Sequence, residues 1–153
     1  MNILLANLSK MVGHSGGAAK VTCNFANEMR RRGHQVSLVY SDVTTGDFFY
    51  PMDKEIPVYD IRHYKGQSIA YPWYLKLKRE LYRTFDKQKA RSVNDQFESS
   101  FLLDNLGDVL KSVKPDIIVS FQSAASKLLL CDLKTEIPVI TMSHGDTSDY
   151  FQT

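Results

Sequence analysis

The 153-residue sequence lacks several features that would assign it to other classes of protein. It has only two cysteines, Cys23 and Cys131, and their separation fits no metal-binding motif. We expect free thiols in a reducing compartment, with one disulfide as the alternative. No apolar run approaches the length of a membrane-spanning helix, and no basic segment precedes the first apolar residues as in a signal peptide. We therefore expect a cytoplasmic protein.

The sequence also has little excess charge. Lysine and arginine total 19 and aspartate and glutamate total 17, which gives a formal net charge of +2. A total this small gives no support for nucleic-acid binding. The length suits one ordinary α/β domain with a real hydrophobic core.

The N-terminal segment alternates between apolar runs and an amphipathic stretch. Residues 3–6 form one apolar run, and residues 36–40 form a second, β-branched one. Between them, four apolar residues recur at the spacing of one buried helix face: Ala18, Val21, Phe25 and Met29. Arginines followed by Gly33 are typical of a helix C-terminus. These patterns predict a right-handed βαβ unit.

The rest of the chain continues this alternation. The apolar runs predict a short strand at 56–61 and buried strands at 116–121 and 138–142. Helical patterns lie at 73–91, 94–113 and 124–133. One apolar face of the first of these helices is formed by Tyr74, Leu77, Leu81 and Phe85. The whole pattern predicts an α/β fold, a doubly wound, mostly parallel Rossmann-like sheet with helices on both faces.

Ligands of such sheets bind at the carboxyl ends of the strands. That rule selects the loops beginning at Asn7, Ser41, Gln122 and Ser143. The first of these loops ends in Gly16 and Gly17, just before a helix, where unpaired backbone N–H groups and the helix dipole favour an anion. A nucleotide diphosphate suits this turn, and a purely structural glycine turn is the alternative.

The glycine spacing matches a dinucleotide-binding fingerprint poorly. Counted from Gly13, the third and sixth positions are Ser15 and Ala18 rather than glycines. Asp42, after the second strand, could hold a ribose in a dehydrogenase. We expect instead that it is a solvated loop aspartate.

The helix predicted at 73–91 is strongly basic. Its cations far outnumber its acids, Glu80 and Asp86. Beside aromatic residues, this face suits an anionic membrane surface, with Lys76, Arg79, Arg83 and Lys87 as the candidate contacts. A solvated helix face and a site for a phosphorylated acceptor are the alternatives.

Several motifs in a fixed order resemble the N-terminal domain of family-4 glycosyltransferases. They are N-I-L-L at 2–5, G-G-A-A at 16–19, N-F-A-N-E at 24–28, R-G-H-Q-V at 32–36, K-P-D-I-I at 114–118, I-P-V-I at 137–140 and S-H-G-D at 143–146. Residues 43–112 match only in general character. The resemblance implies that residues 1–153 are a truncated acceptor-side half of a GT-B fold, without the C-terminal donor-binding domain.

The resemblance also implies an activity. Such enzymes transfer a sugar, with retention of configuration, from a nucleotide-sugar to a glycan or lipid-linked acceptor. They need no metal or cofactor, and the nucleotide-sugar is a substrate. Carried over to this sequence, Gly16 and Gly17 would face the donor diphosphate, and His144 would be the catalytic candidate beside the donor sugar. The acceptor-side candidates are Ser15, Gln122, Ser123 and Asp146, the last with helix capping as the alternative.

The residues that grip the nucleotide belong to the C-terminal domain of these enzymes. The sequence supplies no counterpart, so we expect this chain alone to be inactive as a transferase and to bind nucleotide weakly at most. We expect the whole enzyme to serve polysaccharide or glycolipid synthesis, in the cytoplasm or at the inner face of the membrane. Two other functions stay open: an NAD(P)-binding Rossmann enzyme, and a non-catalytic binding or scaffold domain that uses the basic helix.

Overall fold

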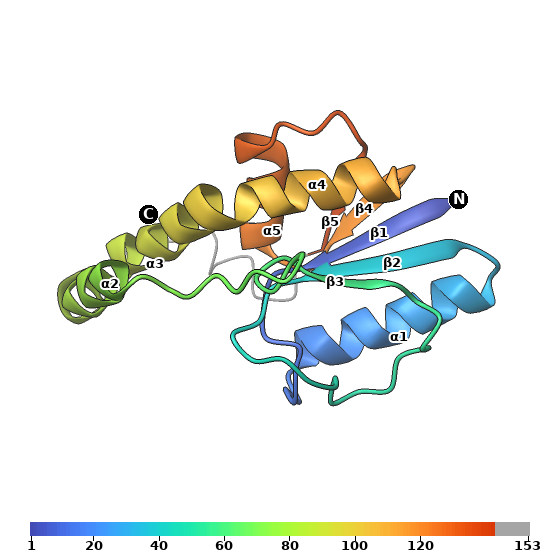
Figure 1. Ribbon diagram of the computed structural model, residues 1–153, viewed down its shortest axis with the longest axis horizontal. Helices are drawn as coiled ribbons and strands as arrows, with labels where there is room; N and C mark the ends of the chain where they lie inside the picture. The colour runs from blue at the N-terminus through green and yellow to red at the C-terminus, as the bar shows by residue number, and fades with distance from the viewer. Residues whose placement is uncertain (143–153) are drawn as a thin grey trace.

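The computed structural model describes residues 1–142, which form a layered α/β domain around one parallel sheet (Figure 1). The sheet has five strands in the order β3-β2-β1-β4-β5, and every pairing is parallel. The strands are β1 Asn2–Asn7, β2 Gln35–Tyr40, β3 Val58–Asp60, β4 Ile117–Ser120 and β5 Val139–Thr141. The prediction of a doubly wound parallel sheet is thus confirmed.

Helices cover both faces of this sheet. Helix α1, Gly17–Arg31, packs on one face, and α4, Leu103–Val113, with α5, Ser123–Lys127, lies on the other (Figure 1). Two further helices, α2 Trp73–Phe85 and α3 Lys87–Phe97, pack side by side and extend beyond the sheet. Short π-helical segments, Glu98–Leu102 and Leu128–Asp132, follow α3 and α5.

The central strand β1 explains why the sheet is buried on both sides. Successive side chains of a strand point to opposite faces. Ile3 and Leu5 belong to the apolar cluster under α1, and Leu4 and Ala6 belong to the cluster under α4 and α5. All four are almost fully buried. A continuous apolar run is therefore what this position requires.

Helix α1 ends as its sequence predicts. Gly33 has a φ of 85°, a left-handed conformation that suits glycine. Its N–H donates to the carbonyl of Arg30 at 2.8 Å, and the N–H of His34 donates to the carbonyl of Met29 at 3.2 Å. These bonds satisfy carbonyls that the helix end leaves free and turn the chain into β2.

The predicted boundary between the middle helices is wrong. The break lies at Asp86, whose extended backbone ends α2 and whose carboxylate accepts the N–H of Lys89 at 3.0 Å. Aspartate is a strong helix N-cap, so α3 begins there and continues through Glu98–Leu102 into α4 without a break near residue 92. Phe101, in the segment Glu98–Leu102, is partly exposed and stacks on Phe97.

The prediction of a buried strand at 138–142 is also wrong. Strand β5 lies at an edge of the sheet rather than in its interior, so Ile140 is half exposed. The apolar face of α2 points to solvent, because the helix packs through its opposite side, where Leu75 is buried. The exposed residues of that face are Tyr74, Leu77, Leu81 and Phe85.

Both cysteines are free thiols, Cys23 in the core beneath α1 and Cys131 at the surface. Within residues 1–142, no helix is both long and apolar enough to cross a membrane.

Candidate functional site

The carboxyl ends of β1 and β4 are joined by a buried asparagine. Asn7 is fully buried, and its amide nitrogen donates to the hydroxyl of Thr22 in α1 at 2.8 Å. Its carbonyl oxygen accepts from the side chain of Gln122 at 2.9 Å and from the hydroxyl of Ser9 at 2.7 Å. Asn7 therefore fixes the glycine loop, α1 and the start of α5 relative to one another. The sequence placed Asn7 at a strand end but gave it no role.

Asp42 anchors the glycine loop from the neighbouring strand. It is only 3% exposed, so the predicted solvated loop aspartate is wrong. One carboxylate oxygen accepts the N–H groups of Met11 and Val12 at 2.8 and 2.9 Å. The other accepts the N–H groups of Val43 and Thr44 at 2.7 and 3.2 Å. Desolvation works to raise the pKa of Asp42, but these four backbone donors outweigh it and lower the pKa.

The turn between Gly16 and α1 is only partly open. The N–H of Gly16 donates to the Nδ1 atom of His14 at 3.1 Å, and a Cβ at Gly16 would lie 2.4 Å from the His14 ring. The imidazole thus covers Gly16, which the sequence did not indicate. A Cβ at Gly17, in contrast, would meet nothing within 4 Å.

The first turn of α1 keeps its backbone donors available. No side chain caps the helix, and the first intrahelical bond starts from the N–H of Lys20, which donates to the carbonyl of Gly16 at 3.1 Å. The N–H groups of Gly17, Ala18 and Ala19 have no acceptor within the helix. This end of α1 can accommodate an anion.

The other acceptor-side candidates fall at the same edge of the sheet. Gln122 is held by Asn7, and Ser123 is exposed at the start of α5. Ser15 is exposed in the glycine loop, and its carbonyl accepts from the hydroxyl of Tyr50 at 2.8 Å. His144 and Asp146 lie outside the described residues, so their predicted roles stay predictions.

Charged residues at the end of β3 and directly after it add to this edge, and they were not among the site residues predicted from the sequence. The carboxylate of Asp60 lies 2.8 Å from the Nδ1 atom of His63. The guanidinium of Arg62 lies 4.9 Å from the ring centre of Phe97, and its buried Nε has no hydrogen-bond partner among residues 1–142. Burial lowers the pKa of Arg62, although the charges of Asp60 and Asp42 oppose the shift. A signal was available in the sequence for Arg62 and His63, because they directly follow the strand predicted at 56–61.

Glu98 is a partly buried carboxyl group in the same region. Desolvation and the charge of Asp95 raise the pKa of Glu98 to about 7, against the charges of Arg62 and Lys127. Asp132 adds to the rise. Nothing in the sequence marked Glu98, because its burial depends on how α3 packs near Arg62 and α5.

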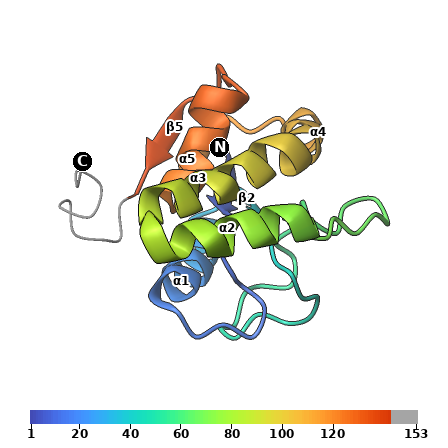
Figure 2. The same ribbon diagram turned by 90° about the vertical axis from the view of Figure 1, so that its left-hand side faces the viewer.

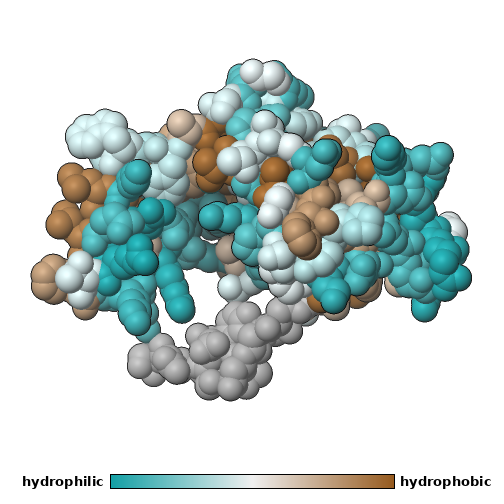
Figure 3. Space-filling model, turned by 90° about the horizontal axis from the view of Figure 1, so that it is seen from below, coloured by the Kyte–Doolittle hydropathy of each residue, from teal (hydrophilic) through white to brown (hydrophobic). Residues whose placement is uncertain are grey.

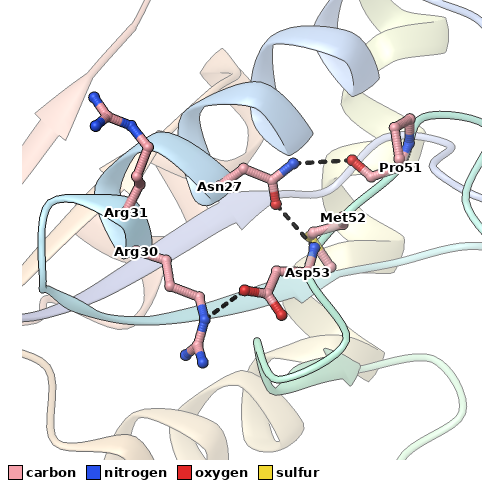
Figure 4. Close-up of a pocket in the computed structure, with 6 residues that line it drawn as sticks. All are labelled: Asn27, Arg30, Arg31, Pro51, Met52 and Asp53. Atoms are coloured by element: carbon pink, nitrogen blue, oxygen red, sulfur yellow. Dashed lines mark hydrogen bonds and ion pairs between the residues drawn. The ribbon is translucent and has the colours of Figure 1, made fainter.

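A surface hollow of about 550 Å³ lies away from this edge (Figure 4). Its polar groups serve the loop after β2: Asn27 bonds to the carbonyl of Pro51 and to the N–H of Asp53, and Arg30 pairs with the Asp53 carboxylate at 2.6 Å. Because α1 runs antiparallel to the strands, its C-terminal half lies toward their amino ends. The hollow therefore supports the loop and is not the strand-end site.

No group of three or more His, Cys, Asp or Glu side chains suited to a metal occurs in the described part of the chain. Of the four basic residues predicted to face a membrane, Lys76, Arg83 and Lys87 are exposed. Arg79 instead lies 5.2 Å from the ring centre of Tyr71 and pairs with Glu80 at 2.9 Å.

The fold and the strand-end loops define a Rossmann-like domain in which the N-terminus of α1, without a side-chain cap, lies at the carboxyl edge of the sheet. The family model described as Glycosyltransferase Family 4 matches residues 15–153, and the chain belongs to that family. This confirms the resemblance of its motifs to the N-terminal domain of family-4 glycosyltransferases.

The fold is similar to a solved structure, sucrose-phosphate synthase from Thermosynechococcus elongatus. The TM-score is 0.58 at 11% sequence identity, over 99% of this chain and 35% of that protein. The chain thus spans about a third of the length of that structure. No curated protein matches the sequence.

Proposed function

We propose that this chain is the acceptor-side half of a retaining, metal-independent glycosyltransferase that uses a nucleotide-sugar donor. The observation that carries the proposal is the first turn of α1 at the carboxyl edge of the sheet, in a member of this family. Its free N–H groups at Gly17, Ala18 and Ala19 face the side where a parallel sheet binds its ligands. They would stabilise the negative charge that develops on the departing diphosphate.

The neighbouring residues have complementary tasks in this proposal. Asn7 and Asp42 keep the glycine loop in place through buried hydrogen bonds, so that the donor amides need no rearrangement during transfer. Ser15, Gln122 and Ser123 offer hydroxyl and amide groups to a polar acceptor. His144, three positions after β5 in the sequence, would hydrogen-bond to the donor sugar. A separate donor-binding domain would close over this edge and supply the contacts to the nucleoside.

An NAD(P)-binding enzyme is the less favoured alternative. In that class an acidic residue after the second strand binds the ribose hydroxyls. Here both carboxylate oxygens of Asp42 already accept backbone N–H groups at 2.7–2.9 Å from Met11, Val12 and Val43, which leaves the carboxylate committed to the loop. No feature described at the carboxyl edge of the sheet favours the other alternative, a non-catalytic scaffold domain.

The Gly17→Ala substitution tests the proposed diphosphate site. We expect the variant to fold with equal or greater stability, because alanine favours a helix over glycine by about 1 kcal/mol and its Cβ meets open space. This chain alone should bind UDP- and GDP-sugars only weakly, and we expect the variant to weaken that binding further, measured by calorimetry at high ligand concentration. The reason is that the methyl group would occupy the path of the phosphate oxygens.

Gly107→Ala is the matched control, because Gly107 lies in α4 and a Cβ there would make only ordinary contact with Leu133. The control should gain stability and leave nucleotide binding unchanged. Measuring the binding of NAD and NADP alongside the sugar nucleotides distinguishes a glycosyltransferase from an NAD(P)-binding enzyme. Preferential binding of NAD(P), or full sugar-nucleotide affinity in Gly17→Ala, would refute the proposal.

A further inference from the structure

The outer face of α2 is an exposed apolar stripe. It consists of large side chains that remain mostly in contact with solvent: Trp73 (77% exposed), Tyr74 (51%), Leu77 (56%), Leu81 (59%) and Phe85 (87%). At 100° per residue these positions fall within one third of the helix circumference. Scattered surface hydrophobics are ordinary, but a continuous row along one helix face marks a contact surface.

Packing fixes the outward direction of this stripe. Leu75, on the opposite side of α2, is 2% exposed and belongs to the main apolar cluster, and Tyr82 packs against that cluster. The neighbouring helix α3 buries Ala90 and Val93 beneath α2. In Figure 2, α2 lies across the front of the molecule, outside α3. Rotating the stripe inward would require Leu75 to leave the core.

Cations flank the stripe. Residues 73–91 contain seven lysines and arginines and only two acids, a local excess of five positive charges. Of these cations, Lys76 and Lys78 of α2 and Lys87 and Arg91 of α3 are exposed and form no ion pair with any described residue. Figure 3 shows brown apolar atoms at the end of the molecule that carries α2, next to teal hydrophilic side chains.

This combination identifies the chemistry of the occupant. A helix with large apolar and aromatic residues on one side and lysine and arginine beside them lies in the interface of an anionic bilayer. A second copy of the chain would bring two sets of unpaired cations together, which opposes association. Charge complementarity therefore favours negatively charged lipid headgroups over self-association.

The position of α2 also suits an acceptor delivered from a bilayer. Strand β1 runs from the N-terminus toward the end of the molecule that carries α2 and α3 (Figure 1), so the carboxyl edge of the sheet faces that end. A membrane against the stripe would lie near the strand-end loops. Only this link to acceptor delivery rests on the proposed function. The docking surface is inferred from the exposure and charge of α2 and its surroundings.

We infer that the chain docks on anionic membranes by inserting the α2 stripe, Trp73, Tyr74, Leu77, Leu81 and Phe85, into the headgroup region, with Lys76, Lys87 and Arg91 contacting lipid phosphates. Trp73 is the only tryptophan in the sequence, so it provides a built-in probe of this surface. Vesicles of phosphatidylcholine and phosphatidylglycerol in equal amounts should shift its fluorescence to shorter wavelengths, and the protein should float with them in a density gradient. Vesicles of phosphatidylcholine alone should do neither.

The Leu77→Ser/Leu81→Ser variant tests insertion. Both side chains are exposed, so circular dichroism and thermal unfolding should match the parent chain, while vesicle affinity should fall by at least about tenfold. The control, Val43→Ser/Phe49→Ser, removes side chains of similar exposure from the loop after β2 and should bind normally.

The Lys76→Gln/Lys87→Gln/Arg91→Gln variant tests the charge contribution and should weaken binding by roughly tenfold or more. Lys20→Gln/Lys54→Gln/Lys111→Gln has the same net charge and exposed positions elsewhere, so it should bind like the parent. Equal binding to neutral vesicles, binding retained by Leu77→Ser/Leu81→Ser, or no vesicle binding at all would overturn the inference. A dimer that this leucine variant dissociates in sedimentation equilibrium would also overturn it and assign the stripe to self-association.

Discussion

Asp42 shows how one side chain can organise the glycine loop through hydrogen bonds to its backbone alone. Its carboxylate ties the backbone of Met11 and Val12 to the end of β2, so the path of the glycine loop depends on it. The sequence indicated only an acidic residue after a strand, a position that serves ribose binding in one family and loop anchoring here. Which of these two roles Asp42 has depends on whether the glycine loop, about thirty residues earlier, folds back against it. The local sequence around Asp42 does not determine this.

Asp42→Asn should destabilise the fold by about 2–3 kcal/mol, because the amide presents a donor to backbone N–H groups and leaves them unsatisfied. The pKa of Asp42 is lowered in the folded state, so its contribution is present above its ordinary pKa of 3.8 and is lost as the pH falls through the folded-state value. Denaturant unfolding should therefore show the difference between parent and variant shrinking in acid. The exposed Asp47→Asn serves as control, and an equal loss there would contradict this role.

Glu98 should make the protein less stable as the pH rises. Its pKa is raised from 4.5 to about 7, so the folded state holds a proton that the unfolded chain releases, and stability falls between those two values. In Glu98→Gln this dependence should disappear. Above neutral pH the variant should be more stable than the parent by on the order of 2–3 kcal/mol, and below the ordinary pKa the two should be similar. Parallel stability curves over the whole range would contradict the assignment.

At the scale of elements, local sequence patterns were enough to predict those features that depend on a single helix or strand. The βαβ unit follows directly from the apolar runs and Gly33, which have the expected conformations. The predicted buried face of α1 is wrong in part: its buried residues are Ala19, Thr22, Cys23 and Ala26. Phe25 and Met29 are only partly buried against the core, and Val21 is exposed. The sequence contains a signal for the helix boundary at Asp86, because an aspartate before a helical stretch is a typical N-cap. The helical periodicity continues on both sides of Asp86, and the prediction therefore placed the boundary too late.

The orientation of α2 could not be read from its sequence. An apolar stripe predicts a buried face in most helices, since burial is its usual use. Here a single leucine on the opposite side, together with contacts to α3, anchors the helix and leaves the stripe outside. Which of two apolar sides is buried depends on the available partner surface, and for α2 that surface includes α3. The candidate site residues at the strand ends were easier to place, because ligands of parallel sheets bind at the carboxyl ends of the strands. Applying that rule requires only the positions of the strands along the chain.

At the scale of the whole molecule, the two thiols report on its cooperativity. Cys131 is exposed and Cys23 is fully buried between α1 and the sheet. In the native protein, one equivalent of thiol should react rapidly with a chromogenic disulfide reagent. The second should react only as fast as the α1 layer opens, and this rate should rise with denaturant. Cys131→Ser should lose the fast phase and keep the slow one. Rapid reaction of both thiols would show that α1 separates from the sheet independently.

The central position of β1 also has a consequence for biosynthesis. Its neighbour β4 begins at Ile117, although β1 itself begins at Asn2, so the ribosome makes the middle of the sheet first and one of its borders last. Contacts that span so much of a chain form slowly, since a long loop must close before they bring any gain. During synthesis, β1, α1 and β2 can assemble early. The other edge of β1 has no partner strand until residues 117–120, which form β4, have left the exit tunnel. Nascent chains stalled before that point should be the species that chaperones hold.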